Sequence, residues 1–248
     1  MDPSPGEGSG EGYSRWTGDQ AVKMYPQVSG GDPLEPNDIS KMEPDPRSIH
    51  QELVRYLGES QQALQMIDAE AVGRFTASVI RCWDEDRQLL LFGNGGSAAT
   101  ATHLAEDLAT YAIPFSEPKR LRVLCLNDSP SIITALGNDL DFDAIFLEQV
   151  QQWARPGDLV LTMSGSGNSS NLIAAIQRAE QLGCETAAMT GFDGGELRGL
   201  VDHPLHVEVH QMQPAQDAHM VMAHMIIHAF RVAVRNVLAQ RTTGSSGS

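Results

Sequence analysis

Apolar residues follow a helical period in two consecutive stretches of the chain. Within residues 48–67 and 70–84, apolar side chains recur every three or four positions, as at Leu53, Leu57 and Leu64. This spacing places the apolar groups along one face of an amphipathic helix. We therefore expect two helices, over 48–67 and 70–84.

Beyond residue 88, short apolar runs alternate with further helical patterns. The runs that predict strands lie at 89–92, 122–126, 158–163, 186–190 and 206–209. The helical patterns lie at 98–108, 131–136, 142–153, 171–181 and 215–238, with a break expected at 137–139 and a turn at 194–196. Strands that are almost continuously apolar and separated by helices predict a parallel sheet covered by helices on both faces.

A glycine-rich turn follows the first predicted strand and opens a helix. Its sequence is Gly93-Asn94-Gly95-Gly96-Ser97. Glycine lets the backbone approach a ligand closely, and a helix N-terminus adds partial positive charge. The turn therefore suits a phosphate group.

A second strand, loop and helix repeat this arrangement further along the chain. The loop at 164–170 reads Ser-Gly-Ser-Gly-Asn-Ser-Ser and leads into the helix expected at 171–181. Such loops gather at the carboxyl ends of parallel strands, so both can face one pocket. Two such loops, the second rich in hydroxyl groups, indicate a small phosphorylated polyol as the ligand.

Two other interpretations of these loops remain open. Each loop on its own also fits a tight strand-to-helix turn with a capping serine. The first loop, as Gly93-x-Gly95-x-x-Ala98, fits the dinucleotide-binding fingerprint, and Asp128 offers an acid after the next strand. A dinucleotide fold has no use for the serine-rich second loop, which disfavours an oxidoreductase.

The two ends of the chain differ in composition from its middle. Residues 1–47 are rich in Gly, Pro, Ser, Asp and Glu without any helical or alternating apolar period, so we expect a disordered acidic extension. Residues 242–248 have the composition of a flexible tail. One domain over residues 48–241 is then expected to carry the function.

Charge and targeting signals exclude several classes of partner. The formal net charge is −15 and the pI is about 4.8, and no basic stripe is available for a nucleic-acid backbone. Residues 1–4 do not resemble a signal peptide, and no run of about 20 apolar residues occurs. We expect a cytoplasmic protein that binds neither nucleic acid nor membrane, with Cys82, Cys125 and Cys184 as structural residues.

Several short motifs occur in one order between residues 48 and 237. They are Gly93-Asn94-Gly95-Gly96-Ser97 followed by His103, Gly137-Asn138-Asp139, Ser164-x-Ser166-Gly167-Asn168-Ser169, Thr190-Gly191-x-Asp193-Gly194-Gly195, and Gln216 with His224. As an ordered set they resemble the sugar isomerase (SIS) domain. Within that group the set is most similar to the sedoheptulose 7-phosphate isomerases, also called phosphoheptose isomerases.

The resemblance implies a flavodoxin-like, three-layer α/β sandwich, assembled as a homotetramer with active sites at subunit contacts. The implied reaction converts sedoheptulose 7-phosphate to D-glycero-D-manno-heptose 7-phosphate through an enediol, in heptose biosynthesis. This chemistry moves a proton between neighbouring carbons, so it needs a base and an acid. The motifs leave the exact sugar phosphate open, because hydroxyl stereochemistry is read by the shape of the pocket.

The resemblance also implies which residues surround the substrate. The implied contacts are Asn94, Gly95 and Gly96 along the sugar phosphate, Asn138 and Asp139 against the sugar, Ser164, Gly165, Ser166 and Ser169 around the phosphate, and Asp107 and Gln216 at the substrate.

Four residues occupy positions that can bind zinc in the family, namely His103, Asp107, Gln216 and His224. The resemblance further implies that Asp107 and His224 shuttle the proton. Glutamate is the usual family residue at the position of Asp107, so this chain departs from the pattern there. The ligand types permit Zn²⁺ without requiring it.

Helix geometry bears on these positions. His103 and Asp107 are four residues apart and share one helix face, whereas Glu106, the fallback base, lies about 100° round the helix. Gln216 and His224 are eight residues, or about 12 Å, apart in a straight helix. Either Gln216 lies in an irregular first turn, or the two residues serve pockets of different subunits.

Two further functions remain as alternatives. One is a non-catalytic SIS adaptor resembling the tetrameric proteins that bind the replication initiator DnaA, and the other is an isomerase of another sugar phosphate. The adaptors, by this resemblance, lack the acid and the last histidine. This chain keeps both, as Asp107 and His224, which favours the enzyme.

Overall fold

The computed structural model describes residues 45–244, with side chains described as far as Gln240. The extension expected over 1–47 and the tail expected over 242–248 lie almost entirely outside these residues. At their borders, helix α3 begins at Pro46 and helix α10 ends at Gly244. The chain divides into two units, 1–51 and 52–248, and the second unit carries the sheet.

Helices and strands alternate along the chain. Their order is α3 (Pro46–Gln65), α4 (Ala69–Asp84), β1 (Gln88–Gly93), α5 (Gly96–Thr110), β2 (Arg122–Cys125), α6 (Pro130–Asp139), α7 (Ala144–Trp153), β3 (Leu159–Ser164), α8 (Ser170–Gln181), β4 (Glu185–Thr190), α9 (Gly195–Leu200), β5 (His203–His206) and α10 (Met212–Gly244). The strands pair in parallel in the order β2-β1-β3-β4-β5. This order confirms the predicted flavodoxin-like α/β fold.

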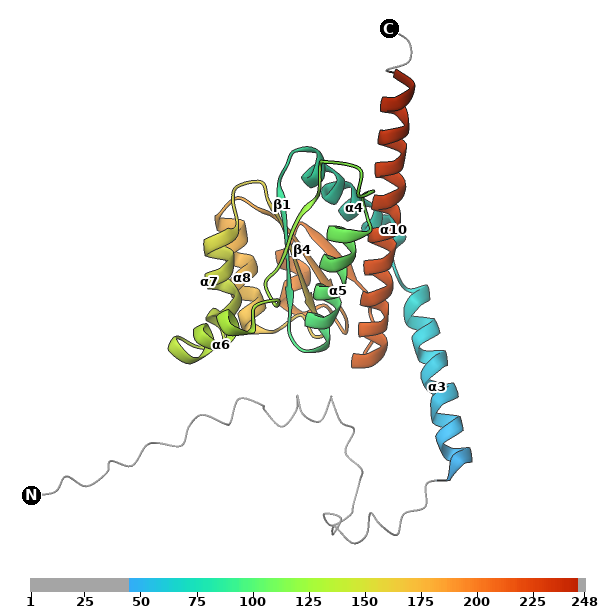
Figure 1. Ribbon diagram of the computed structural model, residues 1–248. Helices are drawn as coiled ribbons and strands as arrows, with labels where there is room; N and C mark the ends of the chain where they lie inside the picture. Colours follow the sequence, from blue (N-terminus) through green and yellow to red (C-terminus); the bar gives the residue numbers. More distant parts are fainter. Residues whose placement is uncertain (1–44, 245–248) are drawn as a thin grey trace, which may run out of the picture. The chain divides into compact units, whose positions relative to one another are not determined.

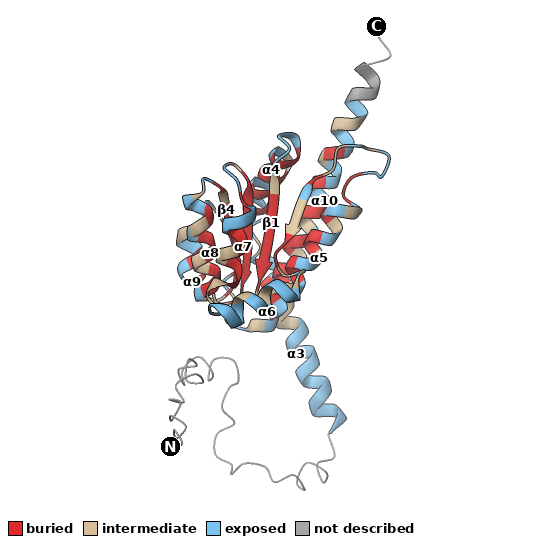
Figure 2. Cartoon of the chain, turned by 60° about the vertical axis from the view of Figure 1, so that its left-hand side comes forward, coloured by how far each residue is buried: buried red, intermediate tan, exposed pale blue. Residues whose placement is uncertain are grey.

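Helices cover both faces of the sheet (Figure 1). Helices α4, α5 and α10 contribute to the apolar core on one face, and α7, α8 and α9 to the core on the other. In β1, Leu89 and Leu91 belong to the first core while Leu90 and Phe92 belong to the second. Both faces of β1 are thus buried, as its colour in Figure 2 shows, which explains its unbroken apolar sequence.

Helix α10 supplies much of the first core. Ala218, Met222, Ile226 and Phe230 are each at most 1% exposed on its inner face. Within residues 45–244, its Met212–Gln240 segment is the one helix long and apolar enough to cross a membrane by length and composition. In this fold about a third of its apolar window is buried, and Ala218, Met222 and Ile226 lie in the first core.

The break expected at 137–139 is wrong. Helix α6 continues through Gly137 and ends at Asp139, so Asn138 and Asp139 form its last turn. A glycine in a helix costs only about 1 kcal/mol relative to alanine, and the C-terminal turn tolerates it. Helix α6 has no buried residue, and it is drawn mostly in the colours of exposed and intermediate residues in Figure 2.

Two elements near residue 200 also differ from expectation. The turn expected at 194–196 is the start of α9, and the last strand lies at His203–His206 rather than at 206–209. A distant side chain helps to begin α9, because the amide oxygen of Asn168 accepts from the N–H of Glu196 at 3.0 Å. Pro204 argues against a strand in the sequence pattern, but β5 tolerates a proline because it lies at the edge of the sheet.

Candidate active site

Two loops meet at the carboxyl ends of neighbouring strands. Strands β1 and β3 are paired, with Gly93 opposite Met163. The helices that follow them leave on opposite faces, since α5 packs in the first core and α8 in the second. Such a point of divergence in a parallel sheet forms a crevice in which ligands bind.

The first loop, residues 93–97, is hereafter the glycine loop. Gly95 caps α5 with a φ of 55°, a conformation that favours glycine, and no side chain caps the helix. Gly95 and Gly96 are exposed, and the first N–H groups of a helix have no acceptor within it. The N–H groups of Gly95 and Gly96 can therefore reach a ligand, whereas those of Ser97 and Ala98 already donate to the carbonyls of Asn94 and Gly95 at 3.0 and 3.1 Å.

Gln216 occupies the space beside the glycine loop. A Cβ atom added to Gly96 would lie 2.7 Å from both polar atoms of the Gln216 side-chain amide. Only glycine at position 96 leaves room for this amide. The N-terminal turn of α10 thus packs directly against the N-terminus of α5.

The second loop, residues 164–169, is hereafter the serine loop. The Ser164 hydroxyl accepts from the N–H of Gly167 at 3.0 Å, and the Ser166 hydroxyl accepts from the N–H of Asn168 at 3.3 Å. Ser169 caps α8 without a side-chain hydrogen bond to the helix. Ser164 is buried, whereas Ser166 and Ser169 are half-buried, so the latter two present the more accessible hydroxyls.

His103, Asp107 and His224 form a compact polar cluster. The Nε2 atoms of His103 and His224 lie 2.9 Å apart, and His103 Nε2 lies 3.6 Å from an Asp107 carboxylate oxygen. One ligand atom from each residue falls within 4.8 Å of the other two. The expected proximity of His103 and Asp107 is therefore observed, while Glu106 turns to Thr110, whose hydroxyl donates to it at 3.2 Å.

The cluster has the chemistry of a zinc site. Its two imidazoles and one carboxylate are ligand types that Zn²⁺ prefers. Donor atoms around a tetrahedral zinc are separated by roughly 3.3 Å at ordinary bond lengths, and the 2.9 and 3.6 Å separations bracket that value. These three residues fit the metal, with a fourth position left for another ligand.

The structure separates Gln216 from this cluster. Helix α10 is continuous from Met212, so the idea of an irregular first turn is wrong, because a first turn accommodates Pro214 without distortion. Eight helical residues, about 12 Å, separate Gln216 from His224. Within one chain, Gln216 belongs to the glycine loop.

Asn138 and Asp139 lie at the exposed end of α6. The Asn138 amide donates to the Asp139 carboxylate at 2.8 Å, and both side chains are exposed. The described residues show no contact of this pair with the His103 cluster or the serine loop.

Two asparagines that the sequence reasoning missed hold the glycine loop. The Asn127 amide donates to the carbonyl of Gly93 at 3.0 Å and accepts from its N–H at 3.1 Å. Asn171 exchanges two hydrogen bonds with Asn94. The position of each asparagine, just after a strand or at the start of a helix that follows a polar loop, is the signal that could have singled them out.

The cysteines are free thiols within the cores. Burial raises the pKa of Cys82 to about 12 and that of Cys184 to about 11, and it also raises the pKa of Cys125. A high pKa keeps the thiol protonated and unreactive. Their expected structural role is consistent with this environment.

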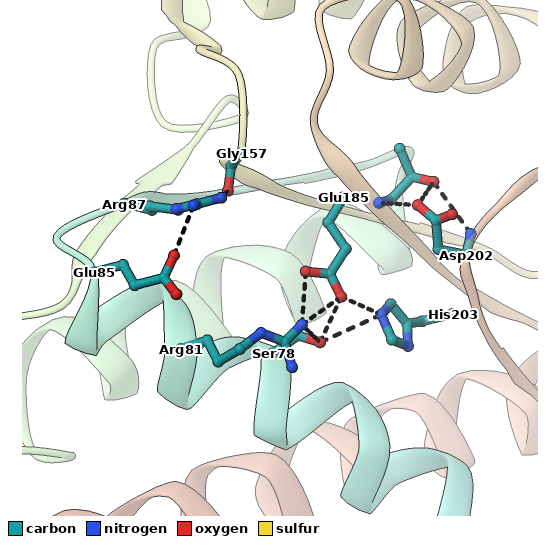
Figure 3. A network of polar contacts seen from close by, with 9 residues as sticks. Ser78, Arg81, Glu85, Arg87, Gly157, Glu185, Asp202 and His203 are labelled. Carbon is teal, nitrogen blue, oxygen red and sulfur yellow. Dashed lines mark hydrogen bonds and ion pairs between the residues drawn. The ribbon is translucent and has the colours of Figure 1, made fainter.

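A separate polar network lies at the amino ends of the strands (Figure 3). Glu185, at the start of β4, meets Ser78 at 2.6 Å and His203 at 2.5 Å, and Arg81 donates to both of its oxygens. Desolvation opposes ionisation of Glu185, but the hydrogen bonds from Ser78, His203 and Arg81 outweigh it and lower its pKa. The network joins α4 to β4 and β5.

The residue types of this network resemble those of a nucleophile triad, but the geometry does not. His203 contacts both Glu185 and Ser78 through the same ring atom, Nε2. A proton relay requires the serine and the carboxylate to engage different ring nitrogens. Ser78 is also 2% exposed, so the cluster is structural.

Comparison with known proteins identifies relatives of this chain. The family profile for the SIS domain matches residues 54–191. A probable phosphoheptose isomerase of Thermoplasma acidophilum is 37% identical over 172 residues, which cover 69% of this chain and 93% of that protein. The phosphoheptose isomerase of Pelobacter propionicus is 40% identical over 150 residues, or 60% of this chain and 78% of that protein.

A solved structure agrees with these matches. Phosphoheptose isomerase GmhA from Neisseria gonorrhoeae superposes with a TM-score of 0.67 at 29% identity, and the match covers 73% of this chain and 98% of that one. The similarity thus spans the sheet and its helices together.

Proposed function

Because the chain belongs to the phosphoheptose isomerase family of SIS domain proteins, we propose that it converts sedoheptulose 7-phosphate to D-glycero-D-manno-heptose 7-phosphate. The observation that carries this proposal is the meeting of His103, Asp107 and His224 on the helices that begin beside the glycine loop.

The serine loop is the proposed phosphate site. Ser166 and Ser169 would donate their hydroxyls, together with the N-terminal N–H groups of α8, whose positive end favours an anion. Ser164 and Gly165 would shape the loop beneath them. The glycine loop, through Asn94, Gly95 and Gly96, would contact the sugar phosphate with its backbone, and Asn138, Asp139 and Gln216 are proposed as contacts to the sugar.

The acid and base are proposed to act at the other end of the substrate. Seven residues of α5, or about 10 Å, separate Gly96 from His103. The glycine loop, proposed to contact the sugar phosphate, is thus set apart along α5 from the cluster that is proposed to act at carbons 1 and 2. The two ends of the substrate then lie at the two ends of the site.

Asp107 is the proposed base that takes the proton from carbon and returns it to the neighbouring carbon. His224 would exchange the proton with the oxygens, so that the enediol forms without free charge building up. His103 lies between them and holds His224 by the 2.9 Å contact of their ring nitrogens.

His103, Asp107 and His224 are also the proposed zinc ligands, and Gln216 would take part only if a partner subunit brings it to the cluster. When bound, Zn²⁺ would polarise the sugar oxygens as a Lewis acid. Ligation would hold the three side chains at the reacting carbons.

The proposed assembly is a homotetramer with sites at subunit contacts, and the proposed location is the cytoplasm, where phosphorylated sugars are made. A subunit contact would also resolve the position of Gln216, which lies about 12 Å from His224 along one α10.

The direct test of function is a coupled assay on a panel of ketose and aldose phosphates. We expect turnover of sedoheptulose 7-phosphate above that of pentose and hexose phosphates. Turnover of only another sugar phosphate would assign that sugar as the substrate. No turnover with any of them would favour the non-catalytic SIS adaptor.

The phosphate site is tested separately by the double change Ser166→Ala and Ser169→Ala. Heptose 7-phosphate should raise the melting temperature of the parent, and the double variant should lose most of this rise while melting normally without ligand. Ser170→Ala, whose hydroxyl instead contacts Asp143, is the matched control. An equal rise in parent and double variant would contradict the assignment.

A further inference from the structure

The glycine loop and the serine loop are joined by one pair of side-chain amides. Asn94 donates to the Asn171 amide oxygen at 2.9 Å, and Asn171 donates back to the Asn94 oxygen at 3.0 Å. The two residues are 77 positions apart in the sequence. Asn94 belongs to the glycine loop, and Asn171 lies in the first turn of α8, directly after the serine loop.

Burial makes Asn171 depend on Asn94 for its side-chain hydrogen bonds. Asn171 is 1% exposed, so its amide cannot exchange Asn94 for bulk water. Leaving one buried amide without its partner is destabilising, whereas replacing both partners by apolar groups can be nearly neutral. The pair therefore holds the two loops in one relative position as long as both amides are present.

The glycine loop is fixed on its other side as well. Asn127, following β2, binds both the N–H and the carbonyl of Gly93. A Cβ atom on Gly93 would lie 2.9 Å from the Met163 carbonyl and from Ser97, so the backbone here is closely packed. The base of the loop is therefore fixed, and the Asn94 side chain is the part of the loop that contacts α8.

We propose that Asn171 is a positioning residue that couples phosphate binding at the serine loop to the glycine loop, and through it to α5 and the acid–base cluster. An anion at the N-terminus of α8 orders the turn that carries Asn171, and the amide pair passes this order to Asn94. The phosphate end of the substrate then sets the position of His103 and Asp107. This proposal rests on the proposed function.

Hydrogen exchange in the full-length protein tests the coupling without relying on turnover. Exchange is followed in peptides covering 89–98 and 164–172, with and without saturating inorganic phosphate. In the parent, phosphate should slow exchange in both peptides. In Asn171→Leu, phosphate should still slow exchange in the 164–172 peptide, but its slowing of exchange in the 89–98 peptide should be at least 5-fold weaker than in the parent. Ser170→Ala is the control and should behave as the parent.

The double variant Asn94→Leu, Asn171→Leu guards against a simple loss of folding. Because both polar partners are removed together, it should melt close to the parent, yet phosphate should no longer protect residues 89–98. A stable double variant in which phosphate still protects both peptides would overturn the proposal.

Steady-state kinetics provide the second readout. In Asn171→Leu, kcat for the heptose phosphate should fall 10- to 100-fold while the inhibition constant of inorganic phosphate changes less than 3-fold. A parental kcat in this variant would overturn the coupling. A parent that shows the coupled exchange but turns over no sugar phosphate would instead overturn the proposed function, whereas a parent that turns over the heptose phosphate but in which phosphate protects neither peptide would overturn the coupling alone.

Discussion

Asp107 is the residue on which the proposed proton transfer most depends. It lies on the same face of α5 as His103, 3.6 Å from that ring, but it is one methylene shorter than the glutamate that the family resemblance implies here. Small misplacements of a catalytic group can cost about 100-fold in rate. The neighbouring Glu106 turns to Thr110 instead.

Asp107→Asn should therefore lower kcat by about 10²–10⁴-fold, because it keeps the size of the side chain but removes its basicity. Asp107→Glu should preserve or raise kcat by restoring the longer reach. Glu106→Gln, the matched control, should leave turnover unchanged. A slow Glu106→Gln variant beside an active Asp107→Asn variant would move the base to Glu106.

His219 is a second residue with a measurable signature. It is 1% exposed on α10, and neither ring nitrogen has a hydrogen-bond partner among the described residues. Burial lowers its pKa from 6.5 to about 4, while the backbone of Thr190 opposes the shift and the nearby His206 of β5 adds to it. The folded protein therefore holds His219 neutral in a range where the unfolded chain binds a proton.

Stability should fall with pH between about 6.5 and 4, because the unfolded state then binds more protons. The loss attributable to His219 is on the order of 3 kcal/mol once pH falls below its folded pKa. Urea unfolding at several pH values should show a shallower pH dependence of stability for His219→Leu than for the parent. Equal pH dependence in parent and His219→Leu would contradict this assignment.

At the scale of elements, the contact of α5 with α10 depends on Gly96. A Cβ atom there would meet the Gln216 amide at 2.7 Å, so Gly96→Ala should displace Gln216 and lower kcat/KM. Gly73→Ala on α4, where no atom lies within 4 Å of the added methyl, should leave activity unchanged and stabilise the helix by up to about 1 kcal/mol.

The double variant Gly96→Ala, Gln216→Ala isolates the cause. Removing the long amide should relieve the clash, so the double variant should melt above Gly96→Ala alone. If the decreases in melting temperature of Gly96→Ala alone and of Gln216→Ala alone simply add in the double variant, the two side chains do not compete for the same space.

An element could be predicted where neighbouring residues determine it, and could not be where it depends on distant contacts. Strand β1 and its glycine loop are encoded in adjacent residues and were predicted to within one residue at the start of the strand. Helix α9 depends on a cap from Asn168, 28 residues away, and β5 on its place at an edge. No local pattern carries such information.

The candidate site shows the same limit. The spacing of His103 and Asp107 predicted their proximity, and the order of the motifs pointed to His224. The Asn94–Asn171 pair could not be found in this way, because it depends on the pairing of β1 with β3 that brings two loops together. The place of Gln216 likewise required the course of α10 past Gly96.

At the scale of the whole molecule, helix α3 indicates assembly. Leu53, Val54 and Leu57 are 54–60% exposed, although Leu53 and Leu57 are among the positions predicted for the apolar helix face. Exposed apolar residues gathered on one helix are typical of a protein–protein contact. We expect four copies to associate.

Sedimentation equilibrium at micromolar concentration should give four times the chain mass of 26.9 kDa. Leu53→Glu with Leu57→Glu should yield smaller species, whereas Phe115→Glu, at an exposed loop position, should not. A stable monomer would contradict both the tetramer and a shared role for Gln216.

Solvent exchange at carbon tests the central claim most directly, because an enediol mechanism must pass the substrate proton to the protein. The parent is incubated with sedoheptulose 7-phosphate in D₂O, and NMR follows deuterium at the carbon next to the carbonyl. We expect deuterium incorporation with the parent and with Glu106→Gln, and its loss with Asp107→Asn. No incorporation by the parent with any heptose phosphate would contradict the isomerase assignment.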